Sequence, residues 1–201
     1  MNAIKTLPPS YKHLNTLNLS GKSAVIGLNL AAIPLLFIFA WLFERLTVFL
    51  RTYNPFPKGI LEFLTTLSWW NAIALPLAIV IMVISHELIH GIFFWIYTQE
   101  RPRFALKGGY AFATAPGWYL PRNQYIFVGL SPLIAISVIS IFLAVFVAQP
   151  IVPYMLIIAS FNAAGALGDM IVVTWVLRLP ETTMVKDDGD TFSAYVPGDN
   201  I

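Results

Sequence analysis

The sequence predicts an all-α integral membrane protein with four transmembrane helices and a β-hairpin-like loop between the second and third helices. Of its 201 residues, 58% are hydrophobic and 11% are charged, whereas about 25% are charged in an ordinary soluble domain. Apolar runs as long as the roughly 20 residues that cross a bilayer as a helix recur along most of the chain. We therefore expect one membrane domain over residues 23–180, with a cytoplasmic N-terminal segment 1–22 and a cytoplasmic tail 181–201.

The first predicted span covers Ala24 to Phe43 and ends at the charged pair Glu44-Arg45. It contains Pro34, which a membrane helix tolerates when neighbouring groups satisfy the carbonyl that proline frees. Residues 52–68 follow, with prolines, a glycine and charged side chains. This composition predicts a turn and then a short, partly apolar stretch in the membrane interface.

The second predicted span begins at the Trp69-Trp70 pair and ends near Trp95, because aromatic side chains of this kind gather at membrane boundaries. From Gln124 to Leu177 the single charged residue is Asp169. The Gln149-Pro150 break divides this stretch into a third and a fourth span.

Two polar regions lie outside these spans. The loop from Thr98 to Asn123 has extended-looking runs, 103–107 and 110–115, on either side of Gly108-Gly109, which predicts a β-hairpin. The tail from Arg178 has too little apolar content for a core of its own. We therefore expect it to be loosely ordered.

Charge predicts the orientation and excludes some functions. Four spans would place both ends and the hairpin on one side with nine of the twelve Lys and Arg, and positive residues concentrate on the cytoplasmic side. Both termini of this multi-pass cell-membrane protein are therefore expected in the cytoplasm. The net charge of +2 is small and scattered, so no nucleic acid is expected as a partner, and without cysteine no thiolate can act as nucleophile or metal ligand.

The second span contains the motif His86-Glu87-Leu88-Ile89-His90. Residues four apart share one face of a helix, so both histidines can bind one Zn²⁺ ion, and Glu87 can take a proton from the attacking water. The alternatives are a chance match and histidines that merely pack. Each ionisable residue costs roughly 2.5 to 3.5 kcal/mol at a bilayer centre, so three in one span favour a metal site.

A catalytic zinc ion usually has three protein ligands and one water. Cysteine is absent, His13 lies in the polar N-terminal segment, and the other acidic residues lie outside the spans, which leaves Asp169. At the helical rise, the midpoint of the two histidines is about 13 Å from Tyr97, and Asp169 is about 13 Å from Arg178. We expect Asp169 to be the third ligand, with an unrelated polar contact as the alternative.

The third and fourth spans contain further candidates for the site. Asn162 is two turns before Asp169 and is expected to bind the substrate backbone or the oxyanion, or else to form an interhelical hydrogen bond. Five small residues between positions 163 and 168 would allow close helix approach. Pro132 is expected either to open the third span for water or substrate or simply to kink it.

With this motif on the second span and an aspartate on the fourth, the chain resembles site-2-protease-type intramembrane metalloproteases. More narrowly, it resembles the membrane proteins grouped as putative zincin peptidases. The resemblance rests chiefly on residues 86–90 and 162–169, although Gly168-Asp169-Met170 replaces the usual Leu-Asp-Gly. It implies zinc ligation by His86, His90 and Asp169 near the cytoplasmic face, with Glu87 as the base.

Three functional interpretations follow. The first is a zinc metalloprotease that cleaves membrane-protein or peptide substrates within the lipid bilayer. The second is a non-catalytic membrane protein with a structural or transport-related zinc site, and the third is hydrolysis of a small or lipid-linked amide. The first is favoured over the second because a structural zinc site needs a fourth protein ligand, and the spans offer no obvious one.

Overall fold

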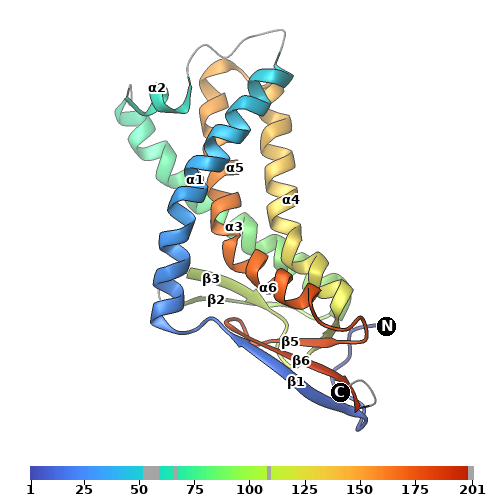
Figure 1. Ribbon diagram of the computed structural model, residues 1–201. Helices are drawn as coiled ribbons and strands as arrows, with labels where there is room; N and C mark the ends of the chain where they lie inside the picture. Colours follow the sequence, from blue (N-terminus) through green and yellow to red (C-terminus); the bar gives the residue numbers. More distant parts are fainter. Residues whose placement is uncertain (52–58, 66–67, 108–109, 199–201) are drawn as a thin grey trace. The chain divides into compact units, whose positions relative to one another are not determined.

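The computed structural model describes residues 1–51, 59–65, 68–107 and 110–198. Three helices are long and apolar enough to cross a membrane, and Figure 1 labels them α1 (Lys22–Leu50), α3 (Trp69–Thr98) and α4 (Arg122–Phe146). A further apolar pair, α5 (Val152–Gly165) and α6 (Leu167–Leu177), is bent by 45° at the break between its helices. The predicted helices are thus present, and the fourth is a broken span if the pair is counted as one.

The ends of the helices follow most of the sequence signals. The Gln149-Pro150 break is confirmed, because α4 ends before it and a 3-10 helix, η1 (Gln149–Ile151), leads into α5. The prediction that the first span ends at Phe43 is wrong, since α1 continues to Leu50. Glu44 there has a partner, because the backbone N–H of Ile60 donates to its carboxylate at 3.1 Å.

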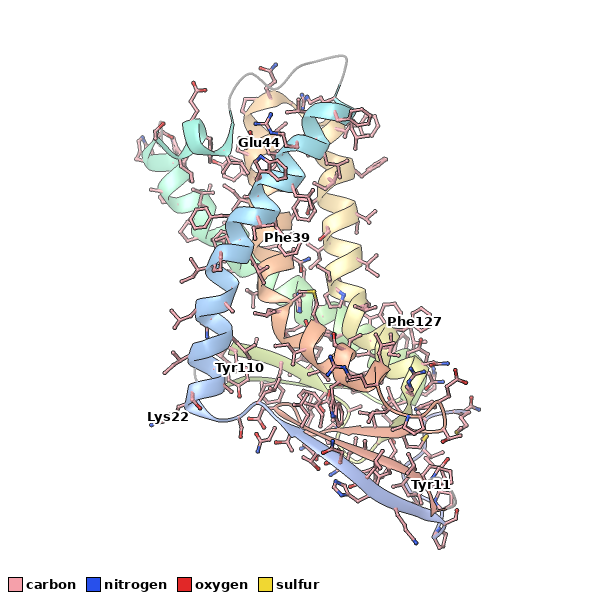
Figure 2. The ribbon with its side chains drawn as sticks, viewed as in Figure 1. Tyr11, Lys22, Phe39, Glu44, Tyr110 and Phe127 are labelled. Atoms are coloured by element: carbon pink, nitrogen blue, oxygen red, sulfur yellow. The ribbon has the colours of Figure 1, made fainter. Side chains whose placement is uncertain are left out.

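The surfaces of the long helices are apolar. Exposed large side chains occur along α1, α3 and α4, and Phe127, labelled in Figure 2, is 63% exposed. Soluble monomers rarely expose such extended apolar surface, whereas a bilayer solvates it. The helices are consistent with a membrane protein.

The chain divides into two compact units, and one of them comprises Asn29–His86 and Pro132–Leu167. Its core joins α2 (Ile60–Thr65) to α4 and α5 through side chains that include Ile60, Ile141 and Leu156. Within this unit, the buried Arg51 donates to the carbonyls of Ala144 and Val147 at the end of α4. Helix α2 is the short stretch predicted after the turn, and residues 52–58 of that turn lie outside the described residues.

The other unit comprises Met1–Leu28, Glu87–Ser131 and Gly168–Ile201, and its described part contains six strands. A hairpin pairs β2 (Arg103–Lys107) with β3 (Tyr110–Thr114), which confirms the prediction, although Gly108 and Gly109 lie outside the described residues. A second, antiparallel sheet has the order β1-β6-β5-β4. Its strands are β1 (Tyr11–Asn18), β6 (Thr191–Pro197), β5 (Met184–Asp187) and β4 (Tyr119–Pro121).

The all-α class is therefore wrong for the parts outside the long helices, and so is the expectation of a loosely ordered tail. Strand β6 alternates, with Phe192, Ala194 and Val196 buried while the residues between them are partly exposed. Phe192 packs in a core that also contains Phe94 of α3 and Val176 of α6. The tail needs no core of its own because one apolar face of the sheet shares the core of the helices.

Polar contacts hold the tail against the hairpin. The Thr114 hydroxyl donates to the backbone carbonyl of Asp187 at 2.6 Å, and the Tyr125 hydroxyl donates to the Asp187 carboxylate at 2.7 Å. Burial raises the pKa of Asp187 to about 6, although the hydrogen bonds from Tyr125 and the Gly189 N–H oppose the rise. The end of β3 and the end of β5 are thereby joined.

Candidate metal centre

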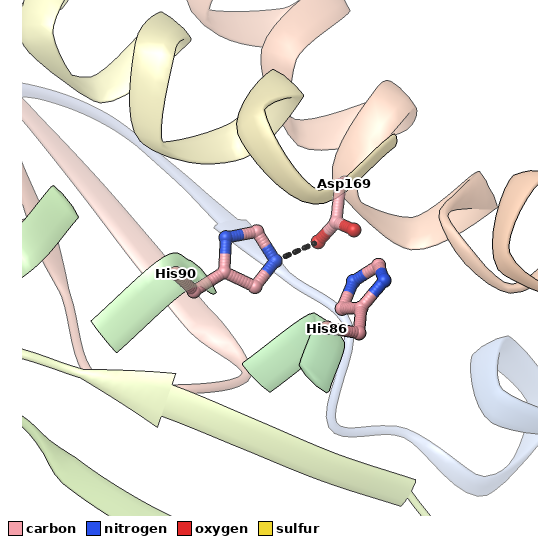
Figure 3. Close-up of side chains that lie close together, drawn as sticks. All are labelled: His86, His90 and Asp169. Carbon is pink, nitrogen blue, oxygen red and sulfur yellow. Dashed lines mark ion pairs between the residues drawn. The ribbon is translucent and has the colours of Figure 1, made fainter. Parts of the chain in front are cut away.

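Two of the predicted ligands face each other. His90 lies on α3 with 7% of its surface exposed, and Asp169 lies in the first turn of α6. The Nε2 atom of His90 is 3.5 Å from an Asp169 carboxylate oxygen, as the dashed line in Figure 3 shows. A carboxylate in the first turn of a helix is also favoured by the helix dipole.

The other nitrogen of His90 is held by a carbonyl that a proline sets free. Pro132 has no N–H, so the carbonyl of Val128, four residues earlier in α4, lacks its usual helical donor. His90 Nδ1 lies 2.9 Å from that oxygen, and the Ser131 hydroxyl donates to it as well, at 2.8 Å. Because a carbonyl can only accept, Nδ1 carries the proton and the Nε2 lone pair is left for a metal ion.

His86 is oriented in a similar way by Asn162, which is fully buried. The Nδ1 atom of His86 is 2.9 Å from Asn162 Oδ1. The amide nitrogen of Asn162 lies 3.3 and 3.4 Å from the carbonyls of Pro132 and Leu133. Since those carbonyls must receive N–H groups, Oδ1 is the acceptor, His86 donates from Nδ1, and its Nε2 is left for a metal ion.

The three predicted ligands come together. His86 and His90 are one turn apart on α3, and one ligand atom from each of His86, His90 and Asp169 lies within 4.8 Å of the other two (Figure 3). Two imidazoles and a carboxylate are a donor set that catalytic zinc accepts, with a fourth position left for water. Ligating histidines almost always donate their second ring N–H to a carbonyl or carboxylate, and both histidines here donate to a carbonyl oxygen.

The remaining candidates have distinct positions. Glu87, the predicted base, is half-buried on α3 beside His86. Ala163, Ala164 and Ala166 are buried, but the run of small residues that contains them also holds the break between α5 and α6. Close helix approach occurs instead at Gly129, where an added Cβ would lie 2.5 Å from Val173 of α6.

The sequence that contains these residues matches a known protein family. The model of a family described as putative zincin peptidase matches residues 79–184, which is more than half of the chain. The chain belongs to this family. In the zincin peptidase family the activity implied is that of a zinc metallopeptidase, and the matched region includes His86, His90 and Asp169. Searches of the curated proteins and of the solved structures found no significant match.

The sequence predicted the three side chains that come together here but not the groups that orient them. Of the two interpretations of Asn162, the structure shows the interhelical hydrogen bond, and contact with a substrate stays a prediction. The Val128 carbonyl was missed. The signal for it was Pro132, because a proline within a helix always frees the carbonyl four residues earlier.

Proposed function

We propose that this chain is an intramembrane zinc metalloprotease that hydrolyses peptide bonds of membrane proteins or peptides with a zinc-activated water. One observation carries the proposal. The Nδ1 atoms of His86 and His90 both donate to oxygen, while the ligand atoms of the two histidines and Asp169 lie within 4.8 Å of one another. The described residues put three protein ligands in this group, the number usual in catalytic zinc sites with an open position.

The chemistry divides between the metal site and Glu87. Zinc held by His86, His90 and Asp169 would lower the pKa of a water molecule towards about 7 and polarise the scissile carbonyl. Glu87 takes the proton of the attacking water on a carboxylate oxygen as the water oxygen bonds to the carbonyl carbon. Glu87 then gives that proton to the leaving nitrogen as the C–N bond breaks, which returns the carboxylate to its starting state.

The substrate must offer an extended segment. A helix keeps its carbonyls in its own hydrogen bonds, so a membrane-spanning substrate has to unwind before its peptide bond can be attacked. Strand β2 has its one described neighbour in β3, and it carries Phe104 and Leu106, 51% and 80% exposed. We expect the free edge of β2 to bind the unwound segment by β-augmentation.

The strand pairing supports a four-span topology with both termini in the cytoplasm. The β1-β6-β5-β4 sheet combines a segment before α1, one between α3 and α4, and two after α6. Segments of one sheet lie on one side of the membrane, so the chain crosses an even number of times between them. The bent α5–α6 pair then returns the chain to the starting side, which holds nine of the twelve Lys and Arg.

The decisive experiment uses Glu87→Gln, which removes the proton acceptor without removing a proposed ligand. We expect wild type and variant to hold equal amounts of zinc in elemental analysis. Cleavage by the variant should fall by at least about 10²-fold, the scale of general-base catalysis. Membrane proteins that co-purify with the variant supply candidate substrates for reconstituted wild-type protein.

His90→Ala is the companion variant, because it should lose both zinc and cleavage. Normal turnover by Glu87→Gln would refute the role of Glu87. Stoichiometric zinc with four protein ligands and no exchangeable water would instead indicate the non-catalytic alternative.

A further inference from the structure

A polar cavity of about 190 Å³ lies at the end of α3, in the same unit as Asp169 and His90. Glu100, Arg101, Arg103 and Trp118 supply its main polar groups. Pockets that hold whole drug-sized ligands measure about 300 to 1,000 Å³. This cavity is therefore suited to a small group, or to the head of a molecule whose remainder lies outside.

The negative charge in this cavity is already balanced. Lys5 forms an ion pair with Glu100, and the Trp118 indole N–H donates to the same carboxylate at 3.0 Å. These contacts, Lys5 first, lower the pKa of Glu100, so it stays ionised and paired. The Lys5 ammonium also lies 5.3 Å from the centre of the Trp118 ring.

The positive charge of the two arginines is not balanced. Within the part of the chain that the structure describes, neither the Arg101 nor the Arg103 guanidinium has a hydrogen-bond or ion-pair partner. A guanidinium presents a planar set of N–H donors that matches the oxygens of a phosphate. The two guanidinium groups in the cavity wall are therefore available to bind a phosphate-like anion.

The backbone holds the two arginines in place. Helix α3 ends with Gln99 in the left-handed conformation at φ 56°, while its N–H donates to the Trp95 carbonyl at 2.7 Å. Arg103 begins β2 and pairs with Thr114 of β3. Arg101 thus follows a capped helix end and Arg103 begins a paired strand, so hydrogen bonds define the backbone on both sides of the cavity, while the two arginine side chains are exposed.

The position of the cavity favours a lipid over a dissolved anion. Helix α3 exposes Ile92, Trp95 and Ile96 immediately before the cavity. In a membrane-spanning α3, acyl chains would contact these side chains, and tryptophan is typical of the headgroup level. A phosphate bound beside Arg101 would then lie at the depth of the lipid headgroups.

We propose that this cavity binds the phosphate of an anionic phospholipid in the leaflet nearest the metal site. The proposal rests on the membrane location of α3 but not on proteolysis. Its probe is dioleoylphosphatidylglycerol, with dioleoylphosphatidylcholine as the neutral comparison. Native mass spectrometry of the full chain in detergent micelles counts the lipid molecules retained at increasing lipid concentration.

The test variant is Arg101→Gln/Arg103→Gln. We expect its apparent affinity for dioleoylphosphatidylglycerol to be at least about tenfold weaker than that of the matched control Lys22→Gln/Arg178→Gln, which removes the same charge from exposed positions that do not line the cavity. Arg101→Lys/Arg103→Lys, which keeps the charge without the forked donors, should show an intermediate affinity. Zinc content should stay equal in all of these proteins, so a failed lipid test is separable from a failed metal site.

Three results would overturn the proposal. An equal loss of lipid affinity in the test and control variants would mean that the lipid is held by general attraction between opposite charges and not by this cavity. Equal retention of the two lipids by wild type would mean that no anionic headgroup is selected. Competition by inorganic phosphate at concentrations similar to that of the lipid would assign the cavity to a dissolved phosphate compound instead.

Discussion

Proline 132 determines which atom holds the second histidine of the motif. Without Pro132 the Val128 carbonyl would accept a backbone N–H in α4, and His90 would have to share it. With proline present, the carbonyl is open to His90 Nδ1 at 2.9 Å. Pro132, which the sequence linked to the entry of water or substrate, thus orients His90, one of the predicted metal ligands.

Pro132→Ala should therefore weaken zinc binding. The alanine N–H would compete for the Val128 carbonyl, and loss of such orienting partners typically costs 10-fold to 100-fold in metal affinity. We expect a loss of about 10-fold, because the carbonyl would be shared and not removed. Competition with a chelator of known zinc affinity measures the change. Pro34→Ala, in the middle of exposed α1, is the matched control and should bind zinc as wild type does.

Asn162→Ala separates the two roles considered for that side chain. If Asn162 positions His86, zinc affinity should fall by about 10-fold to 100-fold. If it binds the oxyanion, kcat should fall while zinc affinity is unchanged. We expect the first result, because Asn162 is fully buried and its amide oxygen accepts from His86; Ser137→Ala, which removes just a 3.4 Å contact to Asn162, should change little.

At the scale of elements, the close approach of α4 to α6 depends on the absence of a Cβ at Gly129. Gly129 follows Val128, whose carbonyl holds His90, and Val173 lies one turn after Asp169. An added Cβ at Gly129 would meet Val173 Cγ2 at 2.5 Å. This contact therefore sets the separation of the helices that carry an orienting group and a ligand.

Gly129→Ala should lower zinc content by forcing α4 and α6 apart, at an overpacking cost of about 1 to 3 kcal/mol. The second variant, Gly129→Ala/Val173→Ala, removes the methyl group that the new Cβ meets. It should regain most of the zinc, measured as the metal-to-protein ratio after purification. If the double variant stays as low as the single one, steric separation of the helices is not the cause.

How far sequence predicts an element depends on where its partners lie. The hairpin around Gly108-Gly109 and the Gln149-Pro150 break are local patterns, and both predictions were confirmed where the residues are described. The histidine motif is also a local pattern, and it lies on the predicted helix, α3. Strand β6 was missed although Phe192, Ala194 and Val196 alternate with more polar residues. Its pairing with β5 had a local signal, the Asp188-Gly189 turn between the two strands. Its other partner, β1, is at the other end of the chain, and that pairing leaves no local signal.

The same distinction applies to the site. Asp169 was predicted as a ligand by elimination, because an acid is costly inside a membrane wherever its partners are. The acceptors for His86 and His90 come from α5 and α4, and which atoms meet depends on tertiary packing. Helix periodicity predicts a face but not the group opposite it.

At the scale of the molecule, the proposed topology can be tested with single cysteines because the chain contains none. Cysteine introduced at Asn15 or Glu181 should be shielded from a membrane-impermeant maleimide in intact cells, whereas cysteine at Glu62 should react. All three positions should react once the membrane is permeabilised. Labelling of Asn15→Cys without labelling of Glu181→Cys in intact cells would contradict an even number of crossings.

The position of β6 between β1 and β5 has a consequence for synthesis of the protein. Strand β1 emerges from the ribosome first, yet it must wait for residues 191–197, which are translated after every apolar helix. Until then the N-terminal segment has no described sheet partner but the isolated bridge between Ile4 and Tyr119. Assembly of this half of the molecule thus follows membrane insertion, and ribosomes stalled before residue 191 should carry chains whose first strand is still open to proteases.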